Sequence, residues 1–128
     1  MRLLLDTHTL YWFIEGAPQL SSHALDVVSD PDNEILLSPA SYWEIALKIS
    51  LGKWQLNRRY EEFLDIALVR YGFVVLPVQA THTAQLIGMP FHHKDPFDRL
   101  LVAQAIVEQI AIVSADEQLD AYNITRIW

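Results

Sequence analysis

The feature that most constrains the fold is a set of short, continuous apolar runs, each followed by a segment with helical spacing. These runs lack the regular alternation of apolar and polar residues that marks a strand with one wet face. Strands buried on both faces are typical of parallel sheets, whose crossover helices cover the two sides. The predicted strands are residues 2–5, 34–37, 73–78 and 110–114, with an edge strand at 124–127.

Capping and turn residues set the limits of the helices between these strands. The predicted helices are residues 7–15, 21–29, 39–51, 58–71, 81–87, 96–109 and 116–122, and residues 88–95 form an irregular loop. Asn57 is the predicted cap of the helix at 58–71. Strands that alternate with helices predict an α/β fold, and a chain of 128 residues fits one domain, 1–128.

Composition narrows the classes of function. The chain has no cysteine, which excludes a disulfide framework and a thiolate metal site. No apolar run approaches the roughly 18 residues of a membrane span, and the N-terminus does not fit a signal peptide, so we expect a cytoplasmic protein. The 9 basic and 16 acidic residues give a net charge of −7. This charge argues against a nucleic-acid binder unless clustered acids hold a divalent cation, which would supply positive charge to a phosphate.

Several acids fall where a parallel sheet collects its ligands, at the carboxyl ends of the strands. Asp6 closes the first strand, and Asp116 lies two residues past the fourth. Glu44 lies in the second turn of the helix that follows the second strand. These three acids are therefore expected on one rim. Asp98 lies in the first turn of the helix at 96–109, and local connectivity gives no reason to place it there.

Each acid taken alone also has a simple structural explanation. Asp6 and Asp95 fit helix caps, and Glu44 fits an i,i+4 ion pair with Lys48. Capping boxes fit Ser41-x-x-Glu44 and Ser114-x-x-Glu117. Caps do not explain why acids recur at strand ends, and carboxylates on one rim would repel each other unless a hard cation such as Mg²⁺ or Mn²⁺ joined them. The chain also lacks a Gly-rich phosphate loop, H-E-x-x-H and G-x-S-x-G.

Four segments carry a resemblance to a known family. They are LLLDTHTLYW (3–12), SYWEIALK (41–48), DPFDRLLVAQA (95–105) and SAD (114–116). In this order they resemble the PIN-domain ribonucleases, in particular the VapC-type toxins of type II toxin–antitoxin systems. The resemblance implies a PIN-like three-layer sandwich, with a central parallel sheet of four to five short strands and helices on both faces. It also implies a Mg²⁺- or Mn²⁺-dependent endoribonuclease that leaves 5′-phosphate and 3′-hydroxyl ends.

The resemblance assigns roles to individual residues. It implies an acidic site with Asp6 and Asp98 as the main metal ligands, and with Glu44 and Asp116 binding a second metal or acting through water. Residues implied nearby, in a supporting role or in contact with RNA, are Ser114, Asp95, Arg99 and Lys94. Arg99 and Lys94 are favoured for the RNA backbone because they adjoin Asp98 and Asp95. The resemblance gives His92 and His93 no ligand role, and we interpret both as loop residues.

The resemblance also implies partners: an RNA substrate, a small cognate antitoxin and a second copy of the chain in a homodimer. The apolar helical segments Leu10–Ile14 and Ala40–Leu51 are candidate antitoxin surfaces, and Trp43 is expected to pack within such a contact or in the core. The alternative function is a non-catalytic PIN-fold module that binds RNA or protein. Stabilisation by Mn²⁺ would separate the two functions.

Overall fold

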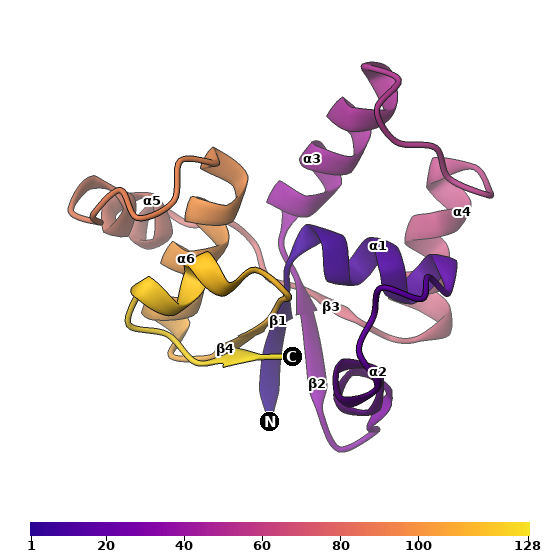
Figure 1. The fold of residues 1–128 in the computed structure, drawn as a ribbon, viewed down its shortest axis with the longest axis horizontal. Helices are drawn as coiled ribbons and strands as arrows, with labels where there is room; N and C mark the ends of the chain where they lie inside the picture. The colour runs from indigo at the N-terminus through magenta and orange to yellow at the C-terminus, as the bar shows by residue number, and fades with distance from the viewer.

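A five-stranded parallel sheet with the strand order β3-β2-β1-β4-β5 forms the centre of the computed structural model, which describes residues 1–128 (Figure 1). The strands are β1 Arg2–Leu5, β2 Glu34–Leu37, β3 Val74–Val75, β4 Ala111–Val113 and β5 Arg126–Ile127. β1 is central: Leu4 lies opposite Leu36 of β2 on one side and opposite Ile112 of β4 on the other. The predicted α/β fold with a parallel sheet is confirmed.

Helices connect successive strands, close to the predicted positions. They are α1 Thr7–Glu15, α2 Ser22–Ser29, α3 Pro39–Ser50, α4 Tyr60–Asp65, α5 Ala80–Ile87 and α6 Pro96–Glu108, with a π-helical turn η1 at Ile66–Arg70 and a 3₁₀ helix η2 at Glu117–Ala121. The prediction that Asn57 caps the fourth of these is wrong. Asn57 donates its side-chain amide to Glu15, and α4 begins at Tyr60 without a side-chain cap.

The two faces of β1 belong to two different cores. Leu3 and Leu5 pack with residues of α1, α2 and α4, whereas Leu4 packs with residues of α6. Side chains of a strand alternate between faces, so a run of three buried leucines needs helices on both sides of the sheet. Figure 1 shows α1–α4 on one side of the strands and α5 and α6 on the other. The predicted three-layer arrangement is confirmed.

The third strand is shorter than predicted. Residues 73–78 were expected to form a buried strand, but only Val74 and Val75 pair with β2. β3 is an edge strand with partly exposed side chains, and Pro77 has no N–H for a longer ladder. Along the whole chain, no helix combines the length and apolar character that crossing a membrane requires.

The connection through α5 and α6 places three chain segments at one end of the sheet. α6 leads into β4 and packs on the sheet face opposite α1. A helix that connects parallel strands runs antiparallel to them, so the N-terminus of α6 lies at the carboxyl ends of β1 and β4. The loop after β1, the loop after β4 and the first turn of α6 therefore meet there.

Candidate functional site

Asp6 closes β1 and faces the carboxyl end of the sheet. One carboxylate oxygen accepts the Thr9 N–H at 2.8 Å, which caps α1, and the other accepts the hydroxyl of Ser114, just past β4. Burial raises the pKa of Asp6 above its ordinary value of 3.8, and the hydrogen bonds from Ser114 and Thr9 oppose this rise. Asp6 therefore caps α1 and is also a buried acid whose ionised form is disfavoured by burial.

Asp98 enters the same space from the first turn of α6. Asp95 caps this helix by accepting the N–H groups of Phe97 and Asp98 at 2.8 and 3.2 Å. Burial first, and then the charges of Asp95, Asp6 and Glu44, raise the pKa of Asp98 to about 7. Electrostatic coupling of this kind requires the acids to be neighbours. The structure thus brings Asp98 to the rim that local connectivity in the sequence did not reach.

Glu44 reaches the site from the second turn of α3. Its side chain is 3% exposed; Oε2 lies 3.1 Å from Lys48 Nζ, and Oε1 is buried with no hydrogen-bond partner. A buried, unpartnered carboxylate oxygen is costly unless a cation or donor satisfies it. The capping box expected at Ser41 is absent, because Ser38 caps α3 and Ser41 accepts the Thr7 hydroxyl.

Asp116 completes the group of acids from the loop after β4. It caps η2 by accepting the Gln118 N–H at 3.0 Å, and its own N–H donates to the Ser114 hydroxyl oxygen. Its second oxygen lies 2.7 Å from Nε2 of His93. A simple capping role and a place in the site again coincide, while the capping box expected at Ser114 and Glu117 does not form.

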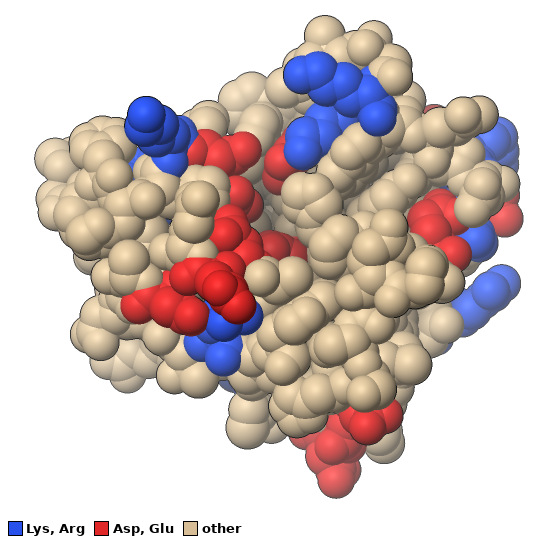
Figure 2. All heavy atoms as spheres, in the orientation of Figure 1, with Lys and Arg blue, Asp and Glu red and all other residues tan.

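A hollow of about 280 Å³ is lined by three of these acids, but not by Glu44. Its lining residues are Asp6, His8, Trp12, Asp98, Ala115 and Asp116. Figure 2 shows acidic side chains gathered along a depression between the α6 and α3 sides of the molecule, with basic side chains at its margins. Oxygen ligands in a desolvated hollow fit Mg²⁺ or Mn²⁺. The unpartnered Glu44 oxygen and the raised pKa of Asp98 are the features that a cation would relieve.

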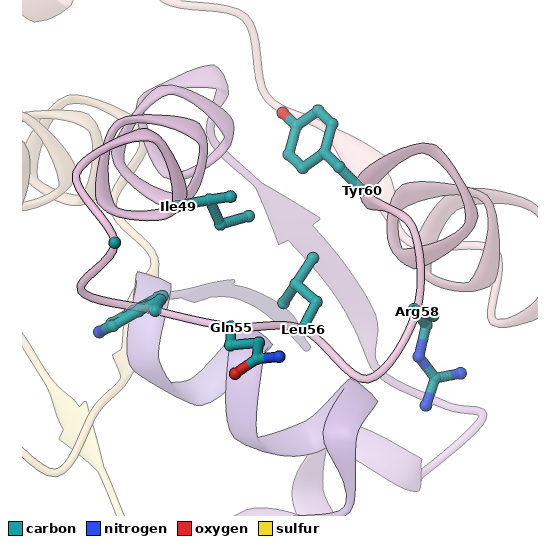
Figure 3. A pocket seen from close by; sticks show the side chains of 7 residues that line it. Ile49, Gln55, Leu56, Arg58 and Tyr60 are labelled. Atoms are coloured by element: carbon teal, nitrogen blue, oxygen red, sulfur yellow. The ribbon is translucent and has the colours of Figure 1, made fainter.

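A larger hollow, of about 420 Å³, lies elsewhere, between the end of α3 and the loop that leads to α4. Figure 3 shows Ile49, Leu56 and Tyr60 around it, with Arg58 as its charged lining residue. It has no acidic lining residue. The lining of this hollow therefore does not suit a cation.

The structure corrects the expectation that Arg99 contacts RNA. Arg99 is 6% exposed, and its guanidinium donates to the backbone oxygens of Pro90 and Met89. Phe91 covers the guanidinium at 3.9 Å. Arg99 thus fixes the loop before α6 and is not free to bind a phosphate, whereas Lys94 is exposed.

Two further residues have contacts that the sequence did not predict. His93 was interpreted as a loop residue with no ligand role; it does lie in a loop, and its ring contacts Asp116 and lies 3.3 Å from Asp98. Trp43 was expected to pack in the core or in an interface; the core is excluded, because Trp43 is 66% exposed and meets Phe97 edge to face. His93 could have been noticed because it lies only two residues before the helix cap Asp95.

Comparisons with known proteins agree with this fold. A model of the PIN domain family matches residues 3–124. No curated protein matches the chain. Among solved structures, the chain is similar to VapBC2 from Rickettsia felis bound to a DNA fragment from their promoter, with 20% identity, a TM-score of 0.71, and 99% and 98% of the two chains covered. FitAcB from Neisseria gonorrhoeae is 18% identical, with a TM-score of 0.65 and coverages of 98% and 96%. VapBC-1 from nontypeable Haemophilus influenzae is 16% identical, with a TM-score of 0.64 and coverages of 99% and 97%.

Proposed function

The chain belongs to the PIN-domain family, and from this premise we propose that it is a divalent-metal-dependent endoribonuclease and the toxin of a toxin–antitoxin pair. PIN domains are generally nucleases. We propose further that residues 1–128 act as one domain in the cytoplasm. The products would carry 5′-phosphate and 3′-hydroxyl ends, as the resemblance to VapC-type toxins implies.

One observation carries this proposal. The carboxylates of Asp6, Asp98 and Asp116 line one hollow, and Glu44 is close enough for its charge to raise the pKa of Asp98. The protein balances these charges only in part: Glu44 pairs with Lys48 through one oxygen while the other has no partner, and the pKa of Asp98 is about 7. Capping accounts for one oxygen of Asp6 and one of Asp116, but not for the burial of Glu44 or for the grouping of the acids. We propose Asp6 and Asp98 as the main metal ligands, with Glu44 and Asp116 completing the site directly or through water.

When bound, a divalent cation supplies positive charge to the scissile phosphate and lowers the pKa of the water that attacks it. The chain itself supplies orientation. Ser114 and the Thr9 N–H fix both oxygens of Asp6, and Asp95 fixes the first turn of α6 that carries Asp98. These contacts hold the carboxylates in place before substrate binds, so little reorganisation is needed during the reaction. The proposed mechanism needs no protein nucleophile.

The margins of the hollow suit single-stranded RNA. The exposed Trp43 offers a face on which a base can stack, beside Phe97. Lys94 and Lys48 offer positive charge, although Lys48 also pairs with Glu44. This combination of an aromatic platform and flanking cations is typical of sites that bind single strands with little base specificity.

The similar solved structures named VapBC and FitAcB support the proposal of an antitoxin partner. Exposed apolar side chains of α3 and of its C-terminal cap offer a surface for it: Trp43, Leu47 and Leu51. The other candidate surface, Leu10–Ile14, is less suitable because Leu10 and Ile14 are buried. We also propose a homodimer, as the family resemblance implies.

The test is cleavage of a mixed pool of transfer and ribosomal RNA by the purified, antitoxin-free chain in Mg²⁺, Mn²⁺ and EDTA. Discrete cuts should appear only with metal, and should disappear in the variant Asp98→Asn. Asp26→Asn, which changes an exposed acid of α2, is the matched control and should cleave normally. Cleavage in EDTA, or undiminished cleavage by Asp98→Asn, would refute the assignment.

The second candidate function is a non-catalytic PIN-fold module that binds RNA or protein. Metal binding discriminates between the two functions, because ligands that bind the folded state raise its stability. Mn²⁺ should raise the melting temperature of the wild-type chain and raise that of Asp98→Asn much less. If Mn²⁺ leaves the melting temperature of the wild-type chain unchanged and no cleavage is seen, the binding module is favoured.

A further inference from the structure

The loop between α5 and α6 is fixed by two buried side chains. Arg99 donates to Pro90 O at 2.9 Å and to Met89 O at 3.4 Å. The Tyr122 hydroxyl, 3.3 Å from the Arg99 guanidinium, donates to Pro90 O at 3.0 Å and accepts the N–H of His93 at 2.9 Å. The backbone of His93 is therefore held in place by contacts on both sides of the loop.

The His93 ring bridges the two acids that enter the site from α6 and from the loop after β4. Its Nε2 lies 2.7 Å from Asp116 Oδ2 and 3.3 Å from Asp98 Oδ2, and its side chain is 12% exposed. These three groups are close enough to hold one metal ion together. The ring nitrogen could thus act in two ways, as a metal ligand or as a hydrogen-bond donor.

The other ring nitrogen decides between these roles. Nδ1 lies 3.1 Å from the backbone N–H of Asp95, which can only donate. Nδ1 therefore accepts, and a neutral imidazole that accepts at Nδ1 carries its proton on Nε2. A protonated nitrogen has no lone pair for a metal, but it is a good donor to carboxylates. Asp95 thereby sets the tautomer of the ring in addition to capping α6.

We propose that His93 is a positioning residue, whose Nε2–H holds Asp98 and Asp116 in the geometry that receives the cation without binding the cation itself. This inference rests on the proposed function, because it concerns the same site. Neighbours that orient metal-binding carboxylates typically change metal affinity or activity by 10- to 100-fold when removed. The His93 contact is shorter with Asp116 than with Asp98, but Asp116 is also held by the Gln118 N–H, so both acids should respond to loss of the ring.

The first test is the tautomer itself. The nitrogen chemical shifts of the His93 ring and its long-range proton–nitrogen correlations should be recorded in the metal-free protein at mildly alkaline pH. We expect the Nε2–H form, with the His93 resonances assigned by their loss in His93→Gln. The Nδ1–H form would overturn the proposal, because it leaves Nε2 free to bind metal.

The second test is Mn²⁺ affinity, measured by electron paramagnetic resonance of the free ion. His93→Gln carries an amide N–H towards the place of Nε2, whereas His93→Asn keeps an acceptor for the Asp95 N–H but is too short to reach the carboxylates. We expect Mn²⁺ binding to weaken by roughly 10- to 100-fold in His93→Ala and His93→Asn, and to be largely restored in His93→Gln. His92→Gln, in which the changed ring packs only edge-on to Tyr122, is the matched control.

Two results of this experiment would overturn the proposal. One is equal Mn²⁺ affinity in all four proteins that differ at position 93. The other is a nitrogen hyperfine coupling of bound Mn²⁺ that is present in the wild-type chain and lost in His93→Gln, which would make His93 a ligand. Neither test uses RNA, so a failure of metal-dependent cleavage, which would refute the proposed function, is distinguishable from a failure of the role assigned to His93.

Discussion

Replacing Asp98 with asparagine should make the metal-free protein more stable at neutral pH, although it removes a proposed metal ligand. The pKa of Asp98 is raised from 3.8 to about 7 by burial and by the charges of neighbouring acids. An acid with a raised pKa in the folded state holds its proton more tightly there than in the unfolded chain. Folding therefore loses stability as the pH rises from about 4 to about 7. Asparagine does not ionise, so the variant does not lose this stability as the pH rises.

The magnitude follows from the two pKa values. They differ by roughly 3, and each unit of difference corresponds to about 1.4 kcal/mol, so the full effect is roughly 4 kcal/mol above pH 7. Water reaches 20% of the Asp98 side chain, which makes this figure an upper limit. The hydrogen bond to His93 is retained, since the asparagine oxygen still accepts. Below about pH 4 the two proteins should be equally stable, because aspartate is then protonated in both states.

The assay is urea unfolding in EDTA at a series of pH values between about 4 and 8, for the wild type, Asp98→Asn and the surface control Asp26→Asn. The stability gain of Asp98→Asn should grow across this range and stay absent in the control. Saturating Mn²⁺ should reverse the order, because it stabilises only the protein that binds it. A difference that does not vary with pH would refute the reasoning, since it would mean that Asp98 carries no unfavourable charge in the folded state.

Three further variants test the surroundings of the site. Trp43→Ala should weaken binding of single-stranded RNA, measured by fluorescence anisotropy, by roughly 10- to 100-fold, because about one stacked base is lost. Its urea unfolding should be unchanged, and unaltered RNA binding would show that Trp43 is not part of the RNA surface. Ser114→Ala removes a hydrogen-bond donor that lowers the pKa of Asp6, so Asp6 should ionise, and Mn²⁺ should bind, at higher pH. Titrations followed by electron paramagnetic resonance measure this shift, and an unshifted profile would contradict it. Arg99→Met should cost about 2–4 kcal/mol of unfolding free energy, because it removes the charged donor to the carbonyls of Pro90 and Met89 and leaves that of Met89 unpaired. Lys94→Met should lower only RNA affinity, and equal stability of these two variants would show that Arg99 is dispensable to the loop.

The positions of Asp6, Glu44 and Asp116 could be predicted because each follows a strand at short range. Apolar runs fix where β1, β2 and β4 lie, and parallel pairing sends all their carboxyl ends to one edge. Asp98 could have been predicted by the same reasoning, carried one step further. A helix that leads into a parallel strand runs antiparallel to it, so the N-terminus of α6 must begin where β4 ends.

The roles of Arg99 and His93 depend on information that local patterns do not hold. Consecutive residues of an α-helix point about 100° apart, so Asp98 and Arg99 cannot both face the same hollow. Because Asp98 points towards the other acids, Arg99 points into the protein, where it donates to the carbonyls of Pro90 and Met89. Two residues that are adjacent on a helix therefore seldom face the same site. The prediction that Arg99 binds RNA failed because it rested on such adjacency to Asp98.

His93 presents the opposite case, in which distance along the chain hides a contact. Its partner Asp116 is 23 residues away, and Arg99 and Tyr122 hold the backbone of the α5–α6 loop from which the ring makes this contact. A histidine in an irregular loop gives no periodicity from which its direction can be read. The identity of a loop residue in such a site becomes interpretable only once the hydrogen bonds that fix the loop are known. For His93, the hydrogen bond from the Asp95 N–H to Nδ1 also determines that Nε2 is the ring nitrogen that faces the acids.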